Sequence, residues 1–321
     1  MAIFDPFKLH PAKPYYLDYS GLNRDDVSRK SPQLLGQLLY DSKTKFVPVW
    51  RSQNFFSKHG KPLSAMRVLN SKNVSKFIDG AEIIYLGRNR NQEAYLCLDL
   101  SQFELVMLDP LNDLGIFGDL RESDNSIDGD DGSIMGYARA MCHWHQKNKH
   151  CSSCGGLTVS ANSGHSRNCN KHDCGNTLFP RTDPAVIIAV TFENQILLGR
   201  QSDWPKGMLS VLAGFVEPGE TPEHAAAREV FEEAGVLTKN IVYQYSQPWP
   251  FPASLMLGFT GEAESVELAV NTDEIETAGW FTREEIELFD GGNFHLPRKL
   301  SISRRLIDDW LLKSNSYDTA R

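Results

Sequence analysis

Runs of apolar residues, bounded by turn-forming residues, predict strands in both halves of the chain. In the first half, the polar segment at 88–92 separates two such runs and predicts a hairpin turn. In the second half, the runs at 185–192 and 195–199 form a hairpin around Glu193 and Asn194. We therefore expect strands at 46–50, 82–87, 94–100, 103–108, 185–192, 195–199, 209–216, 241–247, 254–263 and 276–282.

The apolar spacing changes to that of a helix in two segments outside these strands. A helix is expected from Ile134 to about Lys149, because apolar residues recur there at helical spacing, at Tyr137, Met141 and Trp144. The preceding segment at 118–133 is rich in Gly, Asp and Ser, which predicts a linker. A further helix is expected at 301–313.

A third helix, at 222–234, has both start and stop signals. Thr221 is a suitable N-cap, and Pro222 fits the first helical position because its missing N–H would be unpaired there. Gly235 is a natural helix stop. An apolar stripe for packing is expected from Ala226, Ala227, Val230, Phe231 and Ala234.

This helix also has an acidic face. Glu229, Glu232 and Glu233 are spaced i, i+3, i+4 and therefore lie together. Such carboxylates repel one another unless a cation neutralises them, and hard oxygen ligands select Mg²⁺ or Mn²⁺. These ions screen a diphosphate, polarise its phosphorus and activate a water. Arg228 and Glu232, at i, i+4, can pair and fix the array. The alternative is a solvated acidic helix face.

The whole segment 214–236, GFVEPGETPEHAAAREVFEEAGV, favours the metal site over the solvated face. It fits the pattern G-x5-E-x7-R-E-U-x-E-E-x-G-U, where U is aliphatic, at every fixed position. The segment resembles the Nudix box, the signature of metal-dependent hydrolases that cleave a diphosphate linked to another group. The resemblance implies that Glu229, Glu232 and Glu233 are catalytic.

The same resemblance implies a ligand set for the catalytic Mg²⁺ or Mn²⁺. Glu229 and Glu233 would bind the metal directly, and Glu232 would assist them. The backbone carbonyl of Ala213 would contribute. Glu274, which stands six residues before Trp280, matches a further acidic ligand of the family.

Residues 246–254, SQPWPFPAS, interleave two aromatic residues with three prolines, which hold a segment extended and stiff. Their place between two predicted strands favours a rigid loop beside an active site over a Pro-rich ligand for another protein. The segment resembles the SQPWPFPxS signature of NADH pyrophosphatases at every fixed position. The resemblance implies these substrate-binding residues: Phe179, Phe215, Gln247, Pro248, Trp249, Pro250, Phe251, Pro252, Ala253, Ser254 and Ser303.

Two of these positions depart from the family pattern. Phe179 takes the place of a Tyr, which keeps ring stacking and loses a phenolic hydrogen bond. Ser303 stands where the family usually has Ala. Phe215 and Trp249 are the candidate stacking surfaces for the rings of the substrate.

The implied reaction is the attack of water on one phosphorus of NADH or NAD⁺, which gives AMP and nicotinamide mononucleotide. One alternative keeps the chemistry and removes a 5′ NAD cap from RNA. An alternative of another class is a zinc-ribbon binding module whose Nudix domain is inactive. The intact glutamate set argues against this second alternative, because a binding module has no need of mutually repelling charges.

Four of the six cysteines form the pattern C-x2-C-x14-C-x4-C, with a Gly after each pair: Cys151, Cys154, Cys169 and Cys174. This pattern predicts two turns that clamp one structural Zn²⁺. Disulfides are disfavoured because the N-terminus lacks the apolar core of a signal peptide, which predicts a reducing, cytoplasmic location. His172 leaves a Cys3His set open, although Cys174 is preferred. NADH pyrophosphatases have a similar zinc ribbon, but their second spacing is usually two residues.

Length and charge agree with a soluble protein of two or three domains. The chain has 321 residues, a net charge of −8 and a pI of about 5.6, which disfavours nonspecific binding to nucleic acid. No apolar run approaches the ~20 residues that span a bilayer.

We expect three parts. Residues 1–130 form a β-rich accessory domain for packing or dimerisation, with a weaker resemblance to the N-terminal domains of NADH pyrophosphatases, and the protein is expected to form a homodimer. Residues 131–178 form the linker helix and zinc ribbon. Residues 179–321 form the catalytic Nudix domain, an α/β/α sandwich with a mixed sheet. The helix at 301–313 would cover the far side of that sheet.

Overall fold

The computed structural model describes residues 17, 21–59, 63–123, 127–289 and 293–313 of the chain. Its internal contacts divide the chain into two compact units. The first unit runs from Met1 to Thr182 and includes Trp249–Ala253, and the second contains Asp183–Pro248 and Ser254–Arg321. The three-part division of the chain expected from the sequence stays a prediction. No helix in the described part of the chain is long and apolar enough to cross a membrane.

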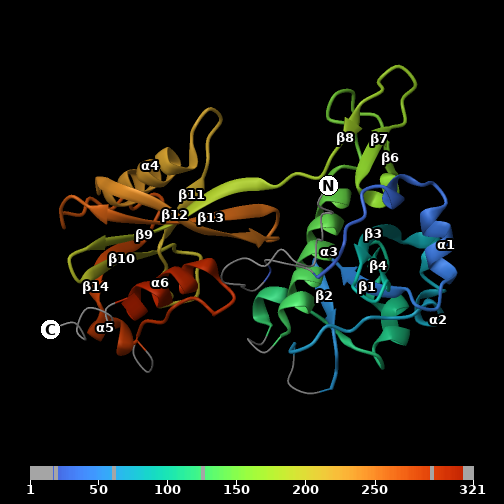
Figure 1. Ribbon diagram of the computed structural model, residues 1–321, viewed down its shortest axis with the longest axis horizontal. Helices are drawn as coiled ribbons and strands as arrows, with labels where there is room; N and C mark the ends of the chain where they lie inside the picture. The colour runs from blue at the N-terminus through green and yellow to red at the C-terminus, as the bar shows by residue number, and fades with distance from the viewer. Residues whose placement is uncertain (1–16, 18–20, 60–62, 124–126, 290–292, 314–321) are drawn as a thin grey trace, which may run out of the picture. The chain divides into compact units, whose positions relative to one another are not determined.

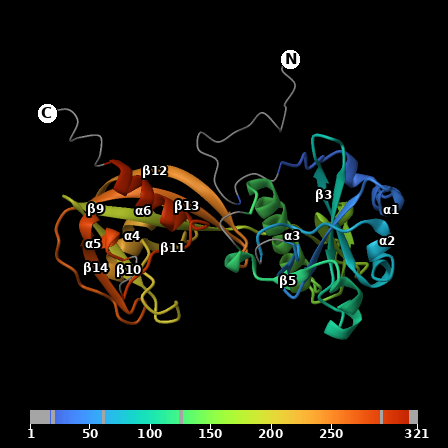
Figure 2. The same cartoon turned by 90° about the horizontal axis from the view of Figure 1, so that it is seen from below.

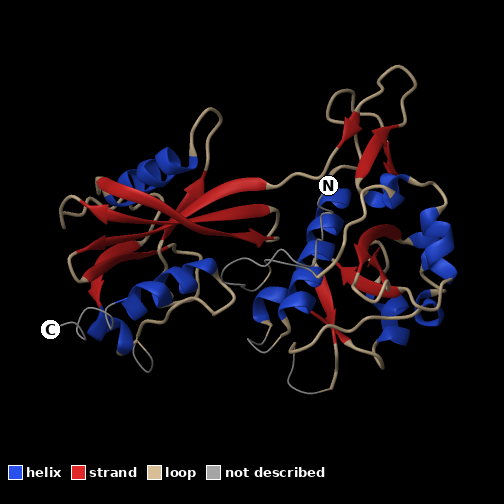
Figure 3. Ribbon diagram, in the orientation of Figure 1, coloured by secondary structure: helices blue, strands red, loops and turns tan. Residues whose placement is uncertain are grey.

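A five-stranded mixed sheet forms the centre of the first unit (Figure 3). Its strand order is β3-β4-β1-β2-β5; β1 and β4 pair in parallel, and the other neighbours pair antiparallel. The strands expected before residue 101 are confirmed, and β2 and β5 were not predicted. The strands are β1 (Lys45–Trp50), β2 (Gln53–Phe56), β3 (Glu82–Arg88), β4 (Ala94–Asp99) and β5 (Ile116–Gly118).

Different helices bury the two faces of this sheet. On one face, α1 (Leu34–Tyr40) and α2 (Ser71–Val74) join a core that includes Phe46 and Leu96. On the other face, α3 (Gly129–Lys147) packs on Val47 and its neighbours through Ile134, Ala138, Met141, Cys142 and Trp144. Successive residues of β1 thus point to opposite cores, as the strand period of two requires.

Two expectations for this unit are wrong. The segment at 103–108 is not a strand, because Leu105–Leu111 form a 3₁₀ helix, η3. Its exposed Leu105, Val106 and Met107 gain no burial from a sheet, and Pro110 has no N–H for a strand ladder. The linker is also shorter than expected, because α3 begins at Gly129, where the Asp128 side chain accepts a hydrogen bond from the N–H of Asp130.

A small antiparallel sheet carries the four-cysteine segment. It consists of β6 (Thr158–Ala161), β7 (Ser166–Cys169) and β8 (Thr177–Leu178). These strands are too short and too polar to show a clear apolar alternation in the sequence. The remaining short helices are η1 (Ser28–Lys30), η2 (Ile78–Gly80), η4 (Leu120–Glu122), η5 (Asn162–Gly164) and α5 (Arg283–Glu287).

A six-stranded mixed sheet forms the second unit, with the order β12-β13-β9-β10-β14 and β11 paired to β9. β13 runs parallel to β9, whereas β10 and β11 pair with β9 antiparallel. All the strands expected here are confirmed, although β11 begins three residues later than predicted. The strands are β9 (Asp183–Phe192), β10 (Gln195–Arg200), β11 (Leu212–Phe215), β12 (Thr238–Trp249), β13 (Ser254–Ala263) and β14 (Thr277–Thr282).

Two helices enclose this sheet and confirm the α/β/α sandwich (Figure 1). Val186, Ile188 and Val190 of β9 face the core beneath α4 (Pro222–Ala234). Ile187 and Ala189 face the core beneath α6 (Ile302–Lys313). Figure 2 shows the same sheet from the α6 side. The continuous apolar run of β9 therefore reflects burial on both faces.

Candidate functional site

Helix α4 begins and ends as its sequence predicts. Thr221 Oγ1 accepts a hydrogen bond from the N–H of His224 at 3.3 Å, and Pro222 takes the first helical position. Gly235 ends the helix with a left-handed φ of 70°. Phe231, which was expected in the apolar stripe, is 54% exposed. The buried stripe is shifted around the helix and includes Ala225 in place of Phe231. The fully buried apolar residues of α4 are Ala225, Ala226, Val230 and Ala234.

Arg228 connects three carboxylates of the site. Its Nε and Nη2 donate to the two carboxylate oxygens of Glu220, at 2.9 and 3.0 Å. Its Nη1 donates to Glu229 at 3.0 Å and to Glu232 at 2.7 Å, and its Nη2 also donates to the carbonyl of Phe215 at 2.9 Å. The hydrogen bonds to Glu220, followed by those to the other two carboxylates, raise the pKa of Arg228. The expected pairing of Arg228 with Glu232 is confirmed.

Gly214, on β11, leaves the space that the Glu229 carboxylate occupies. A Cβ at this position would lie between 1.9 and 2.2 Å from the carboxyl carbon and both oxygens of Glu229. Any side chain at 214 would therefore displace this carboxylate. Ala213, the preceding residue, pairs with Ile187 of β9, so the strand that supports Glu229 is fixed in the sheet.

Glu233 is the most buried glutamate of the helix. It is 4% exposed, and its Oε2 has no hydrogen-bond partner within the described residues. Burial, followed by the negative charges of Glu229 and Glu274, raises the pKa of Glu233 to about 8. Burial also raises the pKa of Glu229, although Arg228 opposes the shift. The negative charge on this side of the helix is thus incompletely compensated.

Glu274 reaches this group from a turn that is attached to the end of α4. The N–H of Asn271 donates to the carbonyl of Glu233 at 3.0 Å, and the N–H of Glu274 donates to the carbonyl of Asn271 at 3.1 Å. Ile275 anchors the turn in the core. Glu229, Glu233 and Glu274 offer hard oxygen donors, and a buried oxygen of Glu233 has no partner. These properties fit a divalent cation such as Mg²⁺ or Mn²⁺.

The four cysteines of the ribbon face one point. Their sulfur atoms all lie within 4.8 Å of one another, and no other group of three or more His, Cys, Asp or Glu ligands in the described ranges is as close. Cys154 and Cys169 sulfurs lie 3.5 Å apart, and those of Cys151 and Cys174 lie 3.7 Å apart. His172 points away and contacts Asp173, with its side chain fully exposed.

Local hydrogen bonds shape the first turn of this cluster. The Cys151 N–H donates to the carbonyl of Gly156 at 2.7 Å, and the Gly155 N–H donates to the carbonyl of Cys151 at 2.9 Å. Gly155 takes a left-handed φ of 71°, which a glycine adopts without strain. The Asn176 amide donates to the Cys151 sulfur at 3.3 Å and lowers the pKa of this thiol. The close approach of four sulfur donors is compatible with one bound metal ion.

The SQPWPFPAS segment is extended only in its first part. β12 continues to Trp249, and residues 250–253 form a turn with a cis peptide bond between Phe251 and Pro252. The segment was expected to be extended throughout, and this expectation is wrong. The rings of Trp249 and Phe251 meet edge to face, 4.9 Å apart, so the turn places two aromatic side chains together.

The other residues expected at the substrate lie in two kinds of environment. Gln247 is buried, and its amide donates to the carbonyl of Leu300 and accepts from the N–H of Ile302, both at 2.8 Å. Ser303 is also buried, 2.7 Å from the hydroxyl of Ser210. Both side chains therefore join α6 to the sheet.

The remaining residues expected at the substrate differ in exposure. Pro248 and Pro252 are exposed, Pro250 is buried, and Trp249, Phe251, Ala253 and Ser254 are half-buried. Phe179 and Phe215 are 67% and 59% exposed.

Arg139, on α3, contacts this turn and was missed in the sequence. Its Nε donates to the carbonyl of Pro250 at 3.0 Å, and its guanidinium lies over the ring of Phe251 at 4.8 Å. The two partners are more than 100 positions apart in the chain, and an Arg within a predicted helix gives no local signal for such a contact.

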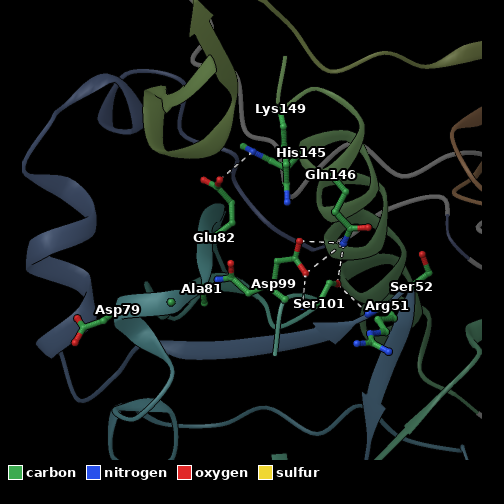
Figure 4. Close-up of a pocket in the computed structure, with 12 residues that line it drawn as sticks. Arg51, Ser52, Asp79, Ala81, Glu82, Asp99, Ser101, His145, Gln146 and Lys149 are labelled. Carbon is green, nitrogen blue, oxygen red and sulfur yellow. Dashed lines mark hydrogen bonds and ion pairs between the residues drawn. The ribbon is translucent and has the colours of Figure 1, made fainter. Parts of the chain in front are cut away.

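A cavity of about 730 Å³ in the first unit also gathers charged groups (Figure 4). Asp99 accepts a hydrogen bond from the Gln146 amide at 3.1 Å, and Glu82 accepts one from Arg167 at 2.9 Å. Burial alone would raise the pKa of Glu82, but His145 and Arg167 outweigh it and lower the pKa to about 2. Glu82 and Asp99 therefore have hydrogen-bond partners, whereas Oε2 of Glu233 has none within the described residues.

Comparison with known proteins matches both units. Residues 181–300 match the family model for the NUDIX domain, and residues 43–144 match the NADH pyrophosphatase-like rudimentary NUDIX domain. The chain is 42% identical to the NAD-capped RNA hydrolase NUDT12 of Homo sapiens over 190 residues, which cover 56% of this chain and 41% of that protein. The chain therefore spans less than half the length of this relative.

Two further relatives are microbial. The NAD-capped RNA hydrolase NudC of Pseudomonas syringae is 42% identical over 178 residues, which cover 56% of this chain and 61% of that protein. The NAD-capped RNA hydrolase of Schizosaccharomyces pombe is 29% identical over 361 aligned positions, which cover 95% of this chain and 96% of that protein. The similarity thus extends over both units in at least one relative.

The hydrogen bonds of Arg228 should contribute to the free energy of unfolding. Arg228→Met removes the donor shared by three carboxylates and should lower the free energy of unfolding by about 2 kcal/mol, because charged hydrogen bonds are lost and like charges remain. Urea unfolding in the presence of a chelator measures this change. Arg304→Met is the matched control: Arg304 forms an ion pair with Asp308 on α6, at 2.8 Å, and this substitution should cost at most ~0.5 kcal/mol. Equal losses in the two variants would contradict the assigned role of Arg228.

Proposed function

The chain belongs to the Nudix hydrolase superfamily and, within it, to the NADH pyrophosphatase subfamily, and on this basis we propose that it hydrolyses the diphosphate bond of NADH and NAD⁺. The products are AMP and nicotinamide mononucleotide, reduced or oxidised. The observation that carries the proposal is the buried, unpartnered carboxylate oxygen of Glu233 beside Glu229 and Glu274.

The residues of α4 have separate tasks in this reaction. Glu229 and Glu233, with Glu274 and the backbone carbonyl of Ala213, would hold Mg²⁺ or Mn²⁺. When bound, the cation screens the diphosphate and activates water. Arg228 fixes Glu229 against Gly214, so that this carboxylate is in place before substrate arrives. Glu232, which shares Arg228, assists this array.

The aromatic side chains supply the contacts to the rest of the substrate. Phe215 follows Ala213 and Gly214 on β11, and its exposed ring is available to a nucleotide ring. Trp249 and Phe251 would provide a second surface, and the exposed ring of Phe179 a third. Stacking on an aromatic ring contributes about 1–3 kcal/mol per base and tolerates different bases. Several rings of this kind would suit a dinucleotide more than a small diphosphate.

We further propose that the four-cysteine cluster binds one structural Zn²⁺. Four thiolates leave no coordination position for a substrate water, so this ion would stabilise the ribbon and take no part in hydrolysis. The close approach of the four sulfur atoms supports this assignment.

Removal of a 5′ NAD cap from RNA is the second candidate function. This reaction would cleave the same diphosphate bond with the same carboxylates. The three relatives named above are NAD-capped RNA hydrolases. A cytoplasmic homodimer also stays a proposal. The exposed apolar side chains of Leu105, Val106 and Met107 offer surface for such a dimer. An inactive binding module is disfavoured, because the repelling carboxylates would serve no purpose in it.

A rate comparison of purified protein with Mg²⁺ tests these alternatives. NADH, NAD⁺, ADP-ribose, diadenosine diphosphate and NAD-capped RNA are assayed side by side. We expect the highest kcat/KM with NADH or NAD⁺. A clear preference for capped RNA would favour the second candidate, and no turnover of any substrate would favour the binding module.

The first activity prediction concerns Glu233. Glu233→Gln should retain the fold and lower turnover of NADH at least about 100-fold, because a charge that holds the cation is lost where phosphoryl charge must be stabilised. Glu223→Gln, which changes an exposed carboxylate in the first turn of the same helix, should leave turnover unchanged. Wild-type kcat for Glu233→Gln at saturating Mg²⁺ would refute the metal assignment.

The second prediction concerns the zinc content of the cysteine cluster. Purified protein should contain about one Zn²⁺ per chain, and Cys174→Ser should lose most of it whereas His172→Ala should not. Elemental analysis and thiol counting under denaturing conditions measure this. Zinc retained in Cys174→Ser but lost in His172→Ala would indicate the Cys3His set. Absence of zinc together with two or four missing thiols would indicate disulfides.

The third prediction concerns residues 249–253, called here the aromatic turn, which carry Trp249 and Phe251. Trp249→Ala should lower kcat/KM for NADH at least ~10-fold more than for ADP-ribose, because the lost stacking contact serves the remote part of the substrate. Steady-state kinetics with both substrates provide the test. Equal losses would mean that the turn supports the fold or the metal site rather than substrate selectivity.

A further inference from the structure

The turn that follows Trp249 is seated on helix α3. Residues Trp249–Ala253 group with the first unit, although the strands on either side of them belong to the second. Three positions of α3 meet this turn: Gly136, Arg139 and His143. Their spacing of i, i+3, i+7 places them on one face of the helix. This face of α3 therefore offers a continuous seat for the turn.

Arg139 is the polar contact of this seat. It is 8% exposed, its Nε donates to the carbonyl of Pro250 at 3.0 Å, and its Nη1 donates to the carbonyl of Ser52. Its guanidinium stacks on the ring of Phe251. No carboxylate of the described residues forms an ion pair with it, so backbone carbonyls and an aromatic face stabilise this buried cation. The turn and the cation consequently depend on each other.

Gly136 lies where the turn packs against α3. A Cβ at this position would lie 3.2 Å from Cγ of Pro250 and 3.2 Å from Cδ2 of Leu17, tighter than ordinary van der Waals contact. The absence of a side chain lets the turn approach the helix. A larger residue would push against Pro250 without touching Arg139 directly.

Close packing does not hold the turn on every side. A cavity of about 320 Å³ borders it, lined by Ser52, Arg121, His143 and the residues 250–252 themselves, with Arg139. Arg121 lies 5.5 Å from the centre of the Phe251 ring, but its guanidinium is already paired with Asp119 at 2.7 Å. A ring beside empty space is free to change rotamer unless a specific contact holds it. Arg139 provides that contact.

We propose that Arg139 is a positioning residue for the aromatic turn, and that by holding this turn it sets the selectivity of the enzyme for dinucleotides. By holding the Pro250 carbonyl and the Phe251 ring, Arg139 fixes the ring pair of Trp249 and Phe251 before substrate binds. The proposal rests on the proposed function, because it takes the turn as a contact to the substrate. Arg139 touches no reacting atom.

Amide hydrogen exchange in the peptide 246–256 tests the positioning without any substrate. Arg139→Met should speed exchange in this peptide several-fold, because the carbonyl clamp and the ring contact are both lost. Arg139→Lys, which keeps the charge and loses the planar fork, should give an intermediate rate. The control is Arg24→Met: Arg24 stacks on Tyr137 of the same helix at 4.2 Å and should leave the exchange unchanged. Wild-type exchange in Arg139→Met would overturn the proposal.

Kinetics then test the selectivity. Arg139→Met should lower kcat/KM for NADH about 10-fold while that for ADP-ribose changes less than about twofold. Combined with Trp249→Ala, it should cause little further loss, because both changes act through the same turn. Independent, multiplicative losses would overturn the proposal. Equal losses for both substrates would do so as well, since they would show general damage to the protein.

Gly136→Ala separates positioning from the stability of α3. Alanine favours a helix over glycine, which offsets the crowding of Leu17 and Pro250, so the melting temperature should change little. The added methyl group should nevertheless crowd Pro250 and lower the preference for NADH over ADP-ribose. An unchanged preference with intact stability would contradict the seat. If wild-type protein hydrolysed neither substrate, the proposed function would fail, and the exchange measurement would still decide whether Arg139 holds the turn.

Discussion

Repulsion between the buried carboxylate of Glu233 and its neighbours Glu229 and Glu274 is the constraint on which the candidate site depends. Glu229 and Glu233 lie in the C-terminal half of α4, where the helix dipole adds further negative potential, and Glu274 approaches them from the following turn. Arg228 compensates only one side of this group. Glu233 is left with a buried oxygen that has no hydrogen-bond partner among the residues that the structure describes. A fold can retain such a group when the surrounding packing over-determines it, and when a cation supplies the missing charge.

The packing of α4 provides this support. Small buried residues bring the helix close to the sheet, and Gly214 leaves the space that the Glu229 carboxylate occupies beside β11. The contrast with the first unit is informative. There, Glu82 is half-buried, but His145 and Arg167 satisfy it and hold its pKa low. The two units thus treat these carboxylates in opposite ways: Glu82 has cationic partners, and Oε2 of Glu233 has no partner among the described residues.

The features that could be predicted from the sequence are those that depend on residues close together in the chain. Thr221, Pro222 and Gly235 defined the helix, and the glutamate spacing followed from its period. Contacts between distant residues were not accessible in this way. Nothing local reveals that Gly214 makes room for Glu229, or that Arg139 clamps Pro250. The segment at 103–108 was misjudged because a short apolar run does not by itself distinguish a strand from a surface 3₁₀ helix.

We propose that the carboxylates of α4 and their cation cleave the diphosphate of NADH. Chromatographic separation of the products of purified protein and NADH, with Mg²⁺ or Mn²⁺ and with a chelator of these ions, tests it most directly. The account predicts AMP and reduced nicotinamide mononucleotide in equal amounts in the presence of either cation, and intact NADH when the cation is withheld. Products of another bond, or the same rate in the chelator, would contradict it.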